Sequence, residues 1–224
     1  MTMTKLKENL FLMQALLLVL LAMLIGCQSA YYTTMEKFGY HKRDLMVDRV
    51  QDARDSQEEA VDQFESALEQ FKSVVNFDGG SLQKKYDVLK TAYDDSEAKA
   101  EAVRDRIDSV EDVAEALFDE WEDELKEYSS ASLRRSSERK LVQTRRHYEK
   151  LIGAMKRAEK KMQPVLSAFK DQVLFLKHNL NAQAIASLQN ELVSVESNVA
   201  SLIKDMEASI AEANDFIRSM GTEK

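Results

Sequence analysis

The sequence predicts an all-α protein, an elongated antiparallel bundle of about four long helices with coiled-coil-like heptad seams. Apolar residues recur at alternating spacings of three and four along most of the chain, the pattern of helices packed through such seams. The 224 residues include only six glycines and one proline, so few turns interrupt the helices. Several stripes are wider than two positions per heptad, which favours a globular bundle over a two-stranded coil.

The first 26 residues have the pattern of a signal peptide and lie outside the predicted fold. Lys5 and Lys7 precede an apolar run over residues 10–25, which ends in Leu-Ile-Gly-Cys at Gly26 and Cys27. This motif resembles the lipobox cut by the bacterial lipoprotein signal peptidase. We therefore expect cleavage after Gly26 and acylation, palmitate included, of Cys27. The alternative is an uncleaved membrane-spanning anchor, since the apolar run is close to the lower length limit for one.

The residues after Cys27 indicate where an acylated chain would reside. Gln28 and Ser29 follow the cysteine, with no aspartate directly after it. By resemblance to the sorting of bacterial lipoproteins, this favours the outer membrane, with the protein facing the periplasm. Two or more acyl chains are needed for stable attachment, and the three chains expected on a lipoprotein satisfy this requirement.

Residues 27–44 form an aromatic and basic segment between the cysteine and the predicted helices. Its rings are those of Tyr31, Tyr32, Phe38 and Tyr40. Amphipathic rings favour the headgroup zone of a membrane, and the lysines and arginines among them favour anionic lipid. The segment is therefore a candidate membrane-interface site. Alternatively, its rings pack the start of the first helix against its neighbours.

The predicted helical domain spans residues 45–224, with helices at about 45–75, 81–128, 133–178 and 181–219. The first seam is predicted to contain seven apolar residues and two polar ones: Val47, Val50, Arg54, Gln57, Val61, Phe64, Leu68, Phe71 and Val75. The second is the most regular: Leu82, Tyr86, Leu89, Tyr93, Ser96, Ala100, Val103, Ile107, Val110, Ala114, Leu117 and Trp121.

The third and fourth seams continue the same spacing. The third contains Leu141, Thr144, Tyr148, Leu151, Met155, Ala158, Met162, Val165, Phe169, Gln172 and Leu176. The fourth contains Leu188, Leu192, Val195, Val199, Leu202, Met206, Ser209, Ala213 and Phe216. Because the phase of the third seam continues across Pro164, we expect a kink there and no helix end.

Three short segments break the helical pattern. In residues 76–81 glycines provide a C-terminal cap and Ser81 an N-cap. Residues 129–132 are serine-rich, and residues 178–181 end in Asn181, which could cap the helix that follows. Long helices joined by turns this short favour antiparallel neighbours.

Charge predicts one of the helix pairs independently. Residues 108–127 hold ten acids and one base, whereas residues 133–161 hold eleven bases and three acids. Folding back at the serine-rich turn lays the acidic end of the second helix beside the basic start of the third. Exposed pairs contribute only about 0–1 kcal/mol each, so their role is to choose the partner helix.

Three stretches of the chain, residues 31–44, 110–121 and 175–185, resemble a bacterial family of all-helical envelope proteins known only as a domain of unknown function. The resemblance covers nearly all of the chain after the signal peptide. It implies an all-helical envelope protein and supplies no catalytic residues.

The residues themselves predict no enzyme, metal site or cofactor. No glutamate stands three residues before His41, His147 or His178, so the di-metal motif of helical bundles is absent. Acylation of Cys27 would leave no thiol, and Gly79-Gly80 lacks the lysine of a phosphate-binding loop. The net charge of −8 disfavours nucleic acid as a partner.

Two functions remain as hypotheses. The first is a membrane-tethered structural or interaction scaffold in the cell envelope, which binds an envelope protein or another copy of itself. The second is a periplasmic carrier or sensor that holds a lipid or small ligand in its core. Met155, Met162 and Met206 would make such a core adaptable.

Overall fold

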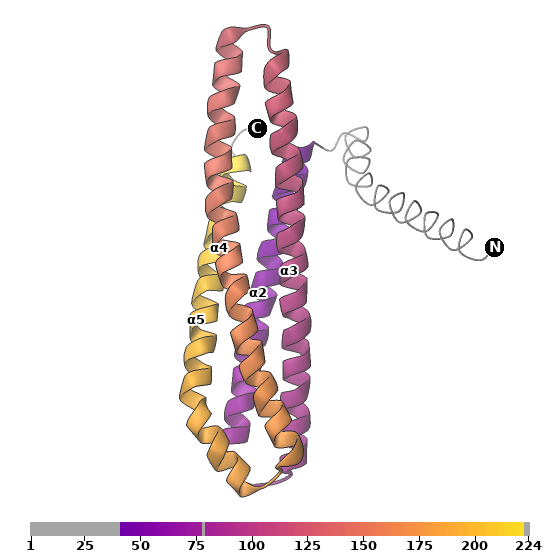
Figure 1. Cartoon of the computed structure of the whole chain (residues 1–224), viewed down its shortest axis with the longest axis vertical. Helices are drawn as coiled ribbons and strands as arrows, with labels where there is room; N and C mark the ends of the chain where they lie inside the picture. The colour runs from indigo at the N-terminus through magenta and orange to yellow at the C-terminus, as the bar shows by residue number, and fades with distance from the viewer. Residues whose placement is uncertain (1–40, 78, 222–224) are drawn as a thin grey trace, which may run out of the picture. The chain divides into compact units, whose positions relative to one another are not determined.

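The computed structural model describes residues 41–77 and 79–221. The chain divides into two compact units, Met1–Leu45 and Met46–Lys224, and the second contains a bundle of long helices (Figure 1). The helices are α2 (Lys42–Val75), α3 (Leu82–Glu127), α4 (Ala131–His178) and α5 (Ala182–Gly221). The described residues contain no strand, and the predicted all-α bundle is confirmed.

Polar contacts between α2 and α3 show that these helices are antiparallel. Each step forward along α2 is matched by an equal step back along α3. The pairs are Asp52 with Arg106 at 3.6 Å, Glu59 with Lys99 at 2.6 Å, and Ser73 with Lys85 at 3.3 Å. This regular register is expected when a short turn joins two straight helices.

The remaining neighbours are antiparallel as well, and they close the bundle into a ring. Helices α3 and α4 are joined by Glu122 with Arg145 at 2.8 Å and by Glu111 with Lys156. Helices α4 and α5 are joined by Lys161 with Asp205 at 2.8 Å. Helix α5 returns to α2 through Glu196 with Lys72 at 3.2 Å and Asn214 with Arg54 at 3.2 Å. The expected pairing of acidic α3 with basic α4 is confirmed.

Side-chain caps fix where three helices begin. The Ser81 hydroxyl accepts a hydrogen bond from the Lys84 amide at 3.4 Å, as predicted. The Ser130 hydroxyl accepts from the Leu133 amide at 3.4 Å, so α4 begins two residues before the predicted start. The Asn181 side chain accepts from the Ala184 amide at 3.0 Å. These bonds satisfy amide donors that the first turn of a helix leaves unpaired.

Helix α4 runs through Pro164 without ending, as the seam pattern predicted. The turn between α2 and α3 contains the two glycines that the sequence analysis identified. Gly79 and Gly80 have φ angles of 139° and 95°, in a region that favours residues without a Cβ atom. The α2–α3 turn therefore depends on these two glycines.

The predicted seam of α2 was wrong at alternate positions. Most buried residues of α2 follow a strict heptad: Met46, Val50, Ala53, Gln57, Ala60, Phe64, Ala67, Phe71 and Val74. Leu45 and the predicted Val75, at the two ends of the helix, are buried as well. The predicted Val47, Arg54, Val61 and Leu68 each lie one residue later and are only half-buried. The larger apolar side chains suggested the wrong phase. Ala53, Ala60 and Ala67 are buried in the core instead.

The other seams agree more closely with the prediction. In α3 every predicted seam residue from Leu89 to Leu117 is buried, whereas Leu82, Tyr86 and Trp121 near the ends are half-buried. In α4 and α5 all predicted seam residues are buried except Tyr148 and Leu192, which are half-buried. The bundle therefore has one continuous core with contributions from all four helices.

Truncating a large side chain at the centre of this core should destabilise the bundle. Phe169 is fully buried, and replacing a buried phenylalanine by alanine costs about 3–5 kcal/mol. We expect Phe169→Ala to lower the free energy of unfolding by about this amount in urea denaturation followed by circular dichroism. Val193→Ala is the control, because Val193 is 75% exposed. A loss below about 1 kcal/mol for Phe169→Ala would contradict the described core.

Candidate functional site

The site residues predicted near the N-terminus lie outside the described residues. These are the cleavage site at Gly26 and Cys27, the acylation site at Cys27, and the candidate interface residues Tyr31, Tyr32, Phe38 and Tyr40. The structure therefore leaves these predictions untested. The features that follow belong to residues 46–221.

The hairpin of α3 and α4 extends beyond the ends of α2 and α5 (Figure 1). Asp52 lies beside Arg106, so Met46, six residues earlier in α2, reaches only about 9 Å further along α3. On the other side, Asp215 and Phe216 near the end of α5 share a hollow with His147 and Lys150. Residues 117–127 of α3 and 131–141 of α4 therefore continue as a pair of helices, which we call the tip.

The core becomes exposed along the tip because only two helices remain to cover it. Leu117 and Leu141 at its base are buried, whereas Trp121 and Leu125 are half-buried. Leu133, near the turn, is 60% exposed. The apolar seam thus continues from the four-helix core into solvent.

Ring contacts fix the base of the tip in place. The ring centroids of Phe118 and Tyr148 lie 5.5 Å apart at 64°, an edge-on contact. The Arg145 guanidinium lies 4.8 Å from the centre of the Phe118 ring while it also pairs with Glu122. Such cation–π and edge-on contacts contribute about 0.5–1.5 kcal/mol each. The tip is therefore a continuation of the bundle with ordered packing at its base.

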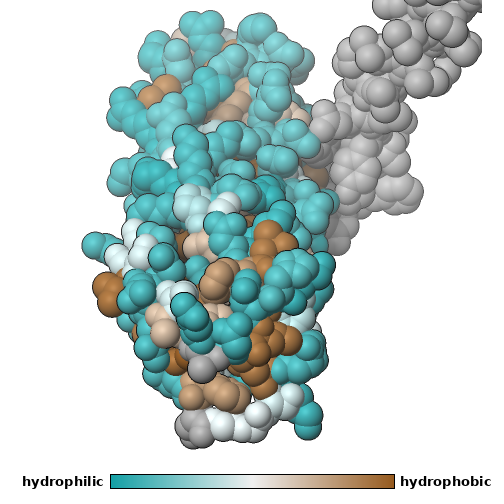
Figure 2. Space-filling view, turned by 60° about the horizontal axis from the view of Figure 1, so that its bottom comes forward, coloured by the Kyte–Doolittle hydropathy of each residue, from teal (hydrophilic) through white to brown (hydrophobic). Residues whose placement is uncertain are grey.

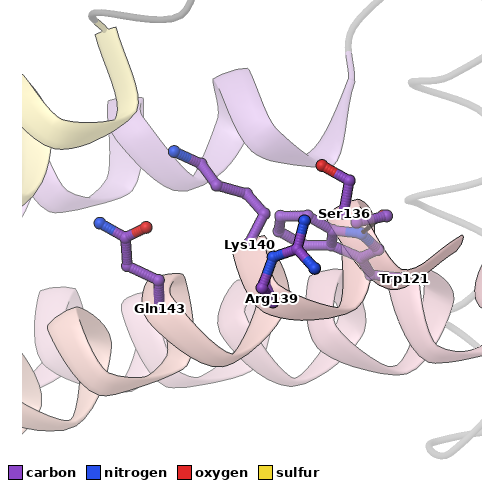
Figure 3. Close-up of a pocket in the computed structure, with 6 residues that line it drawn as sticks. Trp121, Ser136, Arg139, Lys140 and Gln143 are labelled. Atoms are coloured by element: carbon purple, nitrogen blue, oxygen red, sulfur yellow. Dashed lines mark hydrogen bonds between the residues drawn. The ribbon is translucent and has the colours of Figure 1, made fainter. Parts of the chain in front are cut away.

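An open hollow of about 380 Å³ lies on the side of the tip, between α3 and α4. Figure 3 shows Ser136, Arg139, Lys140 and Gln143 standing along α4 beside the indole ring of Trp121. The Trp121 Nε1 donates a hydrogen bond to the Ser137 hydroxyl at 2.8 Å. The polar end of the indole is thus satisfied, and its ring faces the hollow as apolar surface.

Charges at the tip are divided between its two helices. Helix α3 carries the acids Asp119, Glu124 and Glu127, whereas α4 carries the bases Arg134, Arg135 and Arg139. Among the residues that the structure describes, none of these six side chains makes an ion pair. All six are exposed. Although α4 also carries one acid, Glu138, the tip therefore offers mostly negative charge on α3 and mostly positive charge on α4.

Sequence reasoning predicted the acidic and basic runs but missed the tip. The predicted helices already differed in length, with the second and third longer than the first and fourth. Antiparallel folding at short turns then requires the longer pair to extend past the shorter one. That inequality in length was the signal that could have located the tip.

The opposite end of the bundle also exposes apolar side chains. Figure 2 shows them among polar residues, at the end that holds the α2–α3 and α4–α5 turns. Leu174, Phe175 and Leu180 near the α4–α5 turn are 49%, 38% and 38% exposed. Nothing in the described residues covers them, and we assign them no role.

The histidines show no catalytic arrangement in the described part of the chain. His147 borders a hollow of about 150 Å³ with Lys150, Glu212, Asp215 and Phe216. His178 is exposed at the end of α4, and the neighbouring Asn179 makes the turn contact by donating to the Phe175 carbonyl at 2.9 Å. No group of three His, Cys, Asp or Glu side chains in residues 41–77 and 79–221 is placed to hold a metal ion.

Among the described residues, two buried polar side chains of the core have no hydrogen-bond partner. The amide nitrogen and oxygen of Gln57 and the hydroxyl of Ser209 are buried and make no hydrogen bond. The contact between Arg54 and Asn214 places Gln57 and Ser209 within about a turn of each other across α2 and α5. A buried unpaired polar group costs about 1–3 kcal/mol. In contrast, Gln63 donates to the Ala92 carbonyl at 3.0 Å.

This fold and site define a class: a four-helix antiparallel bundle with one extended, charge-divided hairpin. The sequence model of the DUF2959 family, described as a protein of unknown function, matches residues 31–220. Because the match spans most of the chain, the protein belongs to this family, in agreement with the resemblance seen in its sequence. No curated protein and no solved structure matches the chain. None of the described helices is sufficiently long and apolar to cross a membrane.

Replacing Gln57 with an apolar residue of similar shape should stabilise the bundle. The Gln57→Met variant removes two unpaired polar atoms, so we expect the free energy of unfolding to rise by about 1–3 kcal/mol in urea denaturation. Gln63→Met is the matched control, because it removes a hydrogen bond that is made and should be neutral or destabilising. A lower stability for Gln57→Met would mean that the Gln57 amide is satisfied in solution.

Burial raises the pKa of two tyrosines of the core. The pKa of Tyr93 rises to about 12, first through burial and then through its hydrogen bond to Glu97. The pKa of Tyr148 also rises to about 12, through burial and the charges of Glu111 and Glu115. The ordinary value is about 10. The folded state therefore prefers the neutral phenol more strongly than the unfolded chain does.

This preference predicts a loss of stability at alkaline pH. A raised pKa gives a contribution that is complete below the unfolded value, about pH 10, and is lost as the pH rises towards 12. We expect the melting temperature of the wild type to fall across this window. The double variant Tyr93→Phe, Tyr148→Phe should lose less over the same window, because it has no phenol to ionise at these positions. Equal losses would contradict the raised values.

Proposed function

We propose that this protein is a lipid-anchored protein of the bacterial envelope whose helical bundle is an interaction scaffold. The tip is the observation that carries the scaffold role. In it the core seam extends beyond α2 and α5 and Trp121 is only half-buried. Within the described part of the chain, it also holds acids on α3 and bases on α4 that make no ion pair. Surfaces that combine an apolar centre with a charged rim are typical of protein interfaces.

The proposed anchor rests on the sequence. The motif at Gly26 and Cys27 supports cleavage and acylation, and Gln28 and Ser29 support the outer membrane with the bundle in the periplasm. The aromatic side chains of Tyr31, Tyr32, Phe38 and Tyr40 support a segment at the membrane interface. Residues 28–41 would span at most about 50 Å when fully extended, so the anchor would keep the bundle near the membrane.

A second candidate function, a carrier of a lipid or small ligand, is favoured by one observation. Gln57 and Ser209 leave polar atoms unpaired inside an apolar core, and a bound ligand could satisfy them. Native mass spectrometry of protein extracted from membranes separates the two functions. A bound lipid or small molecule that is lost in Gln57→Met would favour the carrier, and its absence would favour the scaffold.

Changing the proposed acylation site tests the anchor directly. In cells we expect Cys27→Ala to abolish palmitate labelling and to leave the protein soluble or unprocessed. Ser29→Ala is the matched control, since it changes a nearby residue and keeps the motif, and it should fractionate like the wild type. If Cys27→Ala were processed and membrane-bound like the wild type, the lipoprotein assignment would be wrong.

A further inference from the structure

We propose that the tip binds the tip of a second copy of this chain, in a two-fold symmetric contact. This inference rests on the proposed interaction role and names the partner. Three features of the tip support this proposal. Its apolar seam is only partly covered, its two helices carry opposite charges, and α2 and α5 limit the directions from which a second copy can approach.

The apolar seam of the tip would be fully buried if two more helices packed against it. In the body of the bundle each helix buries its seam against two neighbours, whereas in the tip, among the described helices, α3 and α4 have only each other. Eleven residues on each side of the turn give the tip a length of about 16 Å. Trp121 and Leu125 are half-buried along it, and Leu133 is 60% exposed. A second helical hairpin would restore the four-helix packing found in the rest of the molecule.

The opposite charges of α3 and α4 indicate that the second hairpin is the tip of another copy. In a two-fold symmetric contact the same surface meets itself, so an element of one copy can face a different element of the other. The acids Asp119, Glu124 and Glu127 on α3 can then face Arg134, Arg135 and Arg139 on α4 of the second copy. Within one bundle, acidic α3 already pairs with basic α4 through Glu122 with Arg145. The unpaired charges of the tip would repeat this pairing between copies.

The ends of α2 and α5 decide the relative direction of the two copies. Below the tip, these helices occupy the inner face of α3 and α4, so a parallel second bundle would collide with them. A second tip must therefore approach from the opposite end, and the two bundles point in opposite directions. This arrangement follows from the unequal helix lengths alone.

The expected association is weak because the contact is small. Specific stable interfaces bury about 1,200–2,000 Å² in total, and two tips of about 16 Å lie at or below the lower end of this range. Buried area alone does not set affinity, but a small interface with few apolar anchors lies at the weak, micromolar end of the range. We therefore expect dimers in cells or at high protein concentration, with a strong dependence on salt because charges contribute.

Site-specific crosslinking of the full chain tests the contact. The parent chain has one cysteine, Cys27, which sets the background. Leu133→Cys adds a thiol at the tip, and Val193→Cys adds one on α5 at a position that is 75% exposed, more than the 60% of Leu133. With a short bis-maleimide in cells, we expect the crosslinked dimer to be at least several-fold more abundant for Leu133→Cys than for Val193→Cys. Equal yields, or no dimer above background, would overturn the inference.

A charge-exchange experiment tests the two-fold pairing. Arg135→Glu, Arg139→Glu places acids on α4 opposite the acids of α3 in the second copy, and Glu124→Lys, Glu127→Lys places bases on α3 opposite the bases of α4. In the Leu133→Cys background, each double variant alone should give several-fold less crosslinked dimer than the parent. Coexpression of the two, with different tags, should restore a mixed dimer. Because these substitutions are exposed, circular dichroism should show unchanged helix content.

The outcomes distinguish this inference from the proposed function. Undiminished dimer in either charge variant, or no mixed dimer on coexpression, would overturn the tip-to-tip contact. Crosslinking of Leu133→Cys to a different envelope protein would also overturn it, yet would leave the interaction role in place. A monomer whose tip amides are protected from hydrogen exchange would show that the same chain covers the tip.

Discussion

The structure depends on burying one seam per helix against two antiparallel neighbours. Most of the stability of a helix in a protein comes from tertiary packing of its apolar face, so each of these helices depends on its neighbours. Phe64, Phe71, Phe169 and Phe216 lie fully inside the shared core. Where α2 and α5 end, that packing is no longer available, and the same seam becomes a surface.

The electrostatic pairs follow from this arrangement and do not cause it. They lie at the exposed edges between helices, where each is worth about 0–1 kcal/mol. Glu122 with Arg145 and Glu111 with Lys156 agree in register with the packed seams, and so they disfavour other pairings. Towards the tip the helices still carry opposite charges but leave several unpaired. A pattern that guides intramolecular pairing in the body is thus available for intermolecular pairing at the tip.

The fold was largely predictable because most seams are regular. The alternation of spacings from Leu89 to Leu117 defined the buried face of α3, including the polar Ser96. In α2 the spacing admitted two phases that share Val50, Gln57, Phe64 and Phe71. The bulk of Val61 and Leu68 favoured the wrong phase, because spacing alone does not show how closely the helices approach.

The candidate site was less predictable, because the tip depends on how four helix ends align in space. The unpaired state of Gln57 likewise depends on the positions of its neighbours across the core. Spacing had placed Gln57 in the seam but could not show whether its amide found a partner there.

The closure of the ring between α2 and α5 has a consequence for the order in which the bundle forms. Arg54 and Asn214 meet although 160 residues separate them, whereas every other pair of neighbouring helices is joined by a short turn. A hairpin of two helices joined by a short turn forms through contacts that are close in the sequence. Bringing α5 against α2 closes a much longer loop and therefore costs more chain entropy. During synthesis α2 is made first, yet its second neighbour is made last. Until the final forty residues exist, the face of α2 that contacts α5 has no partner, so a chain truncated within α5 would leave it uncovered.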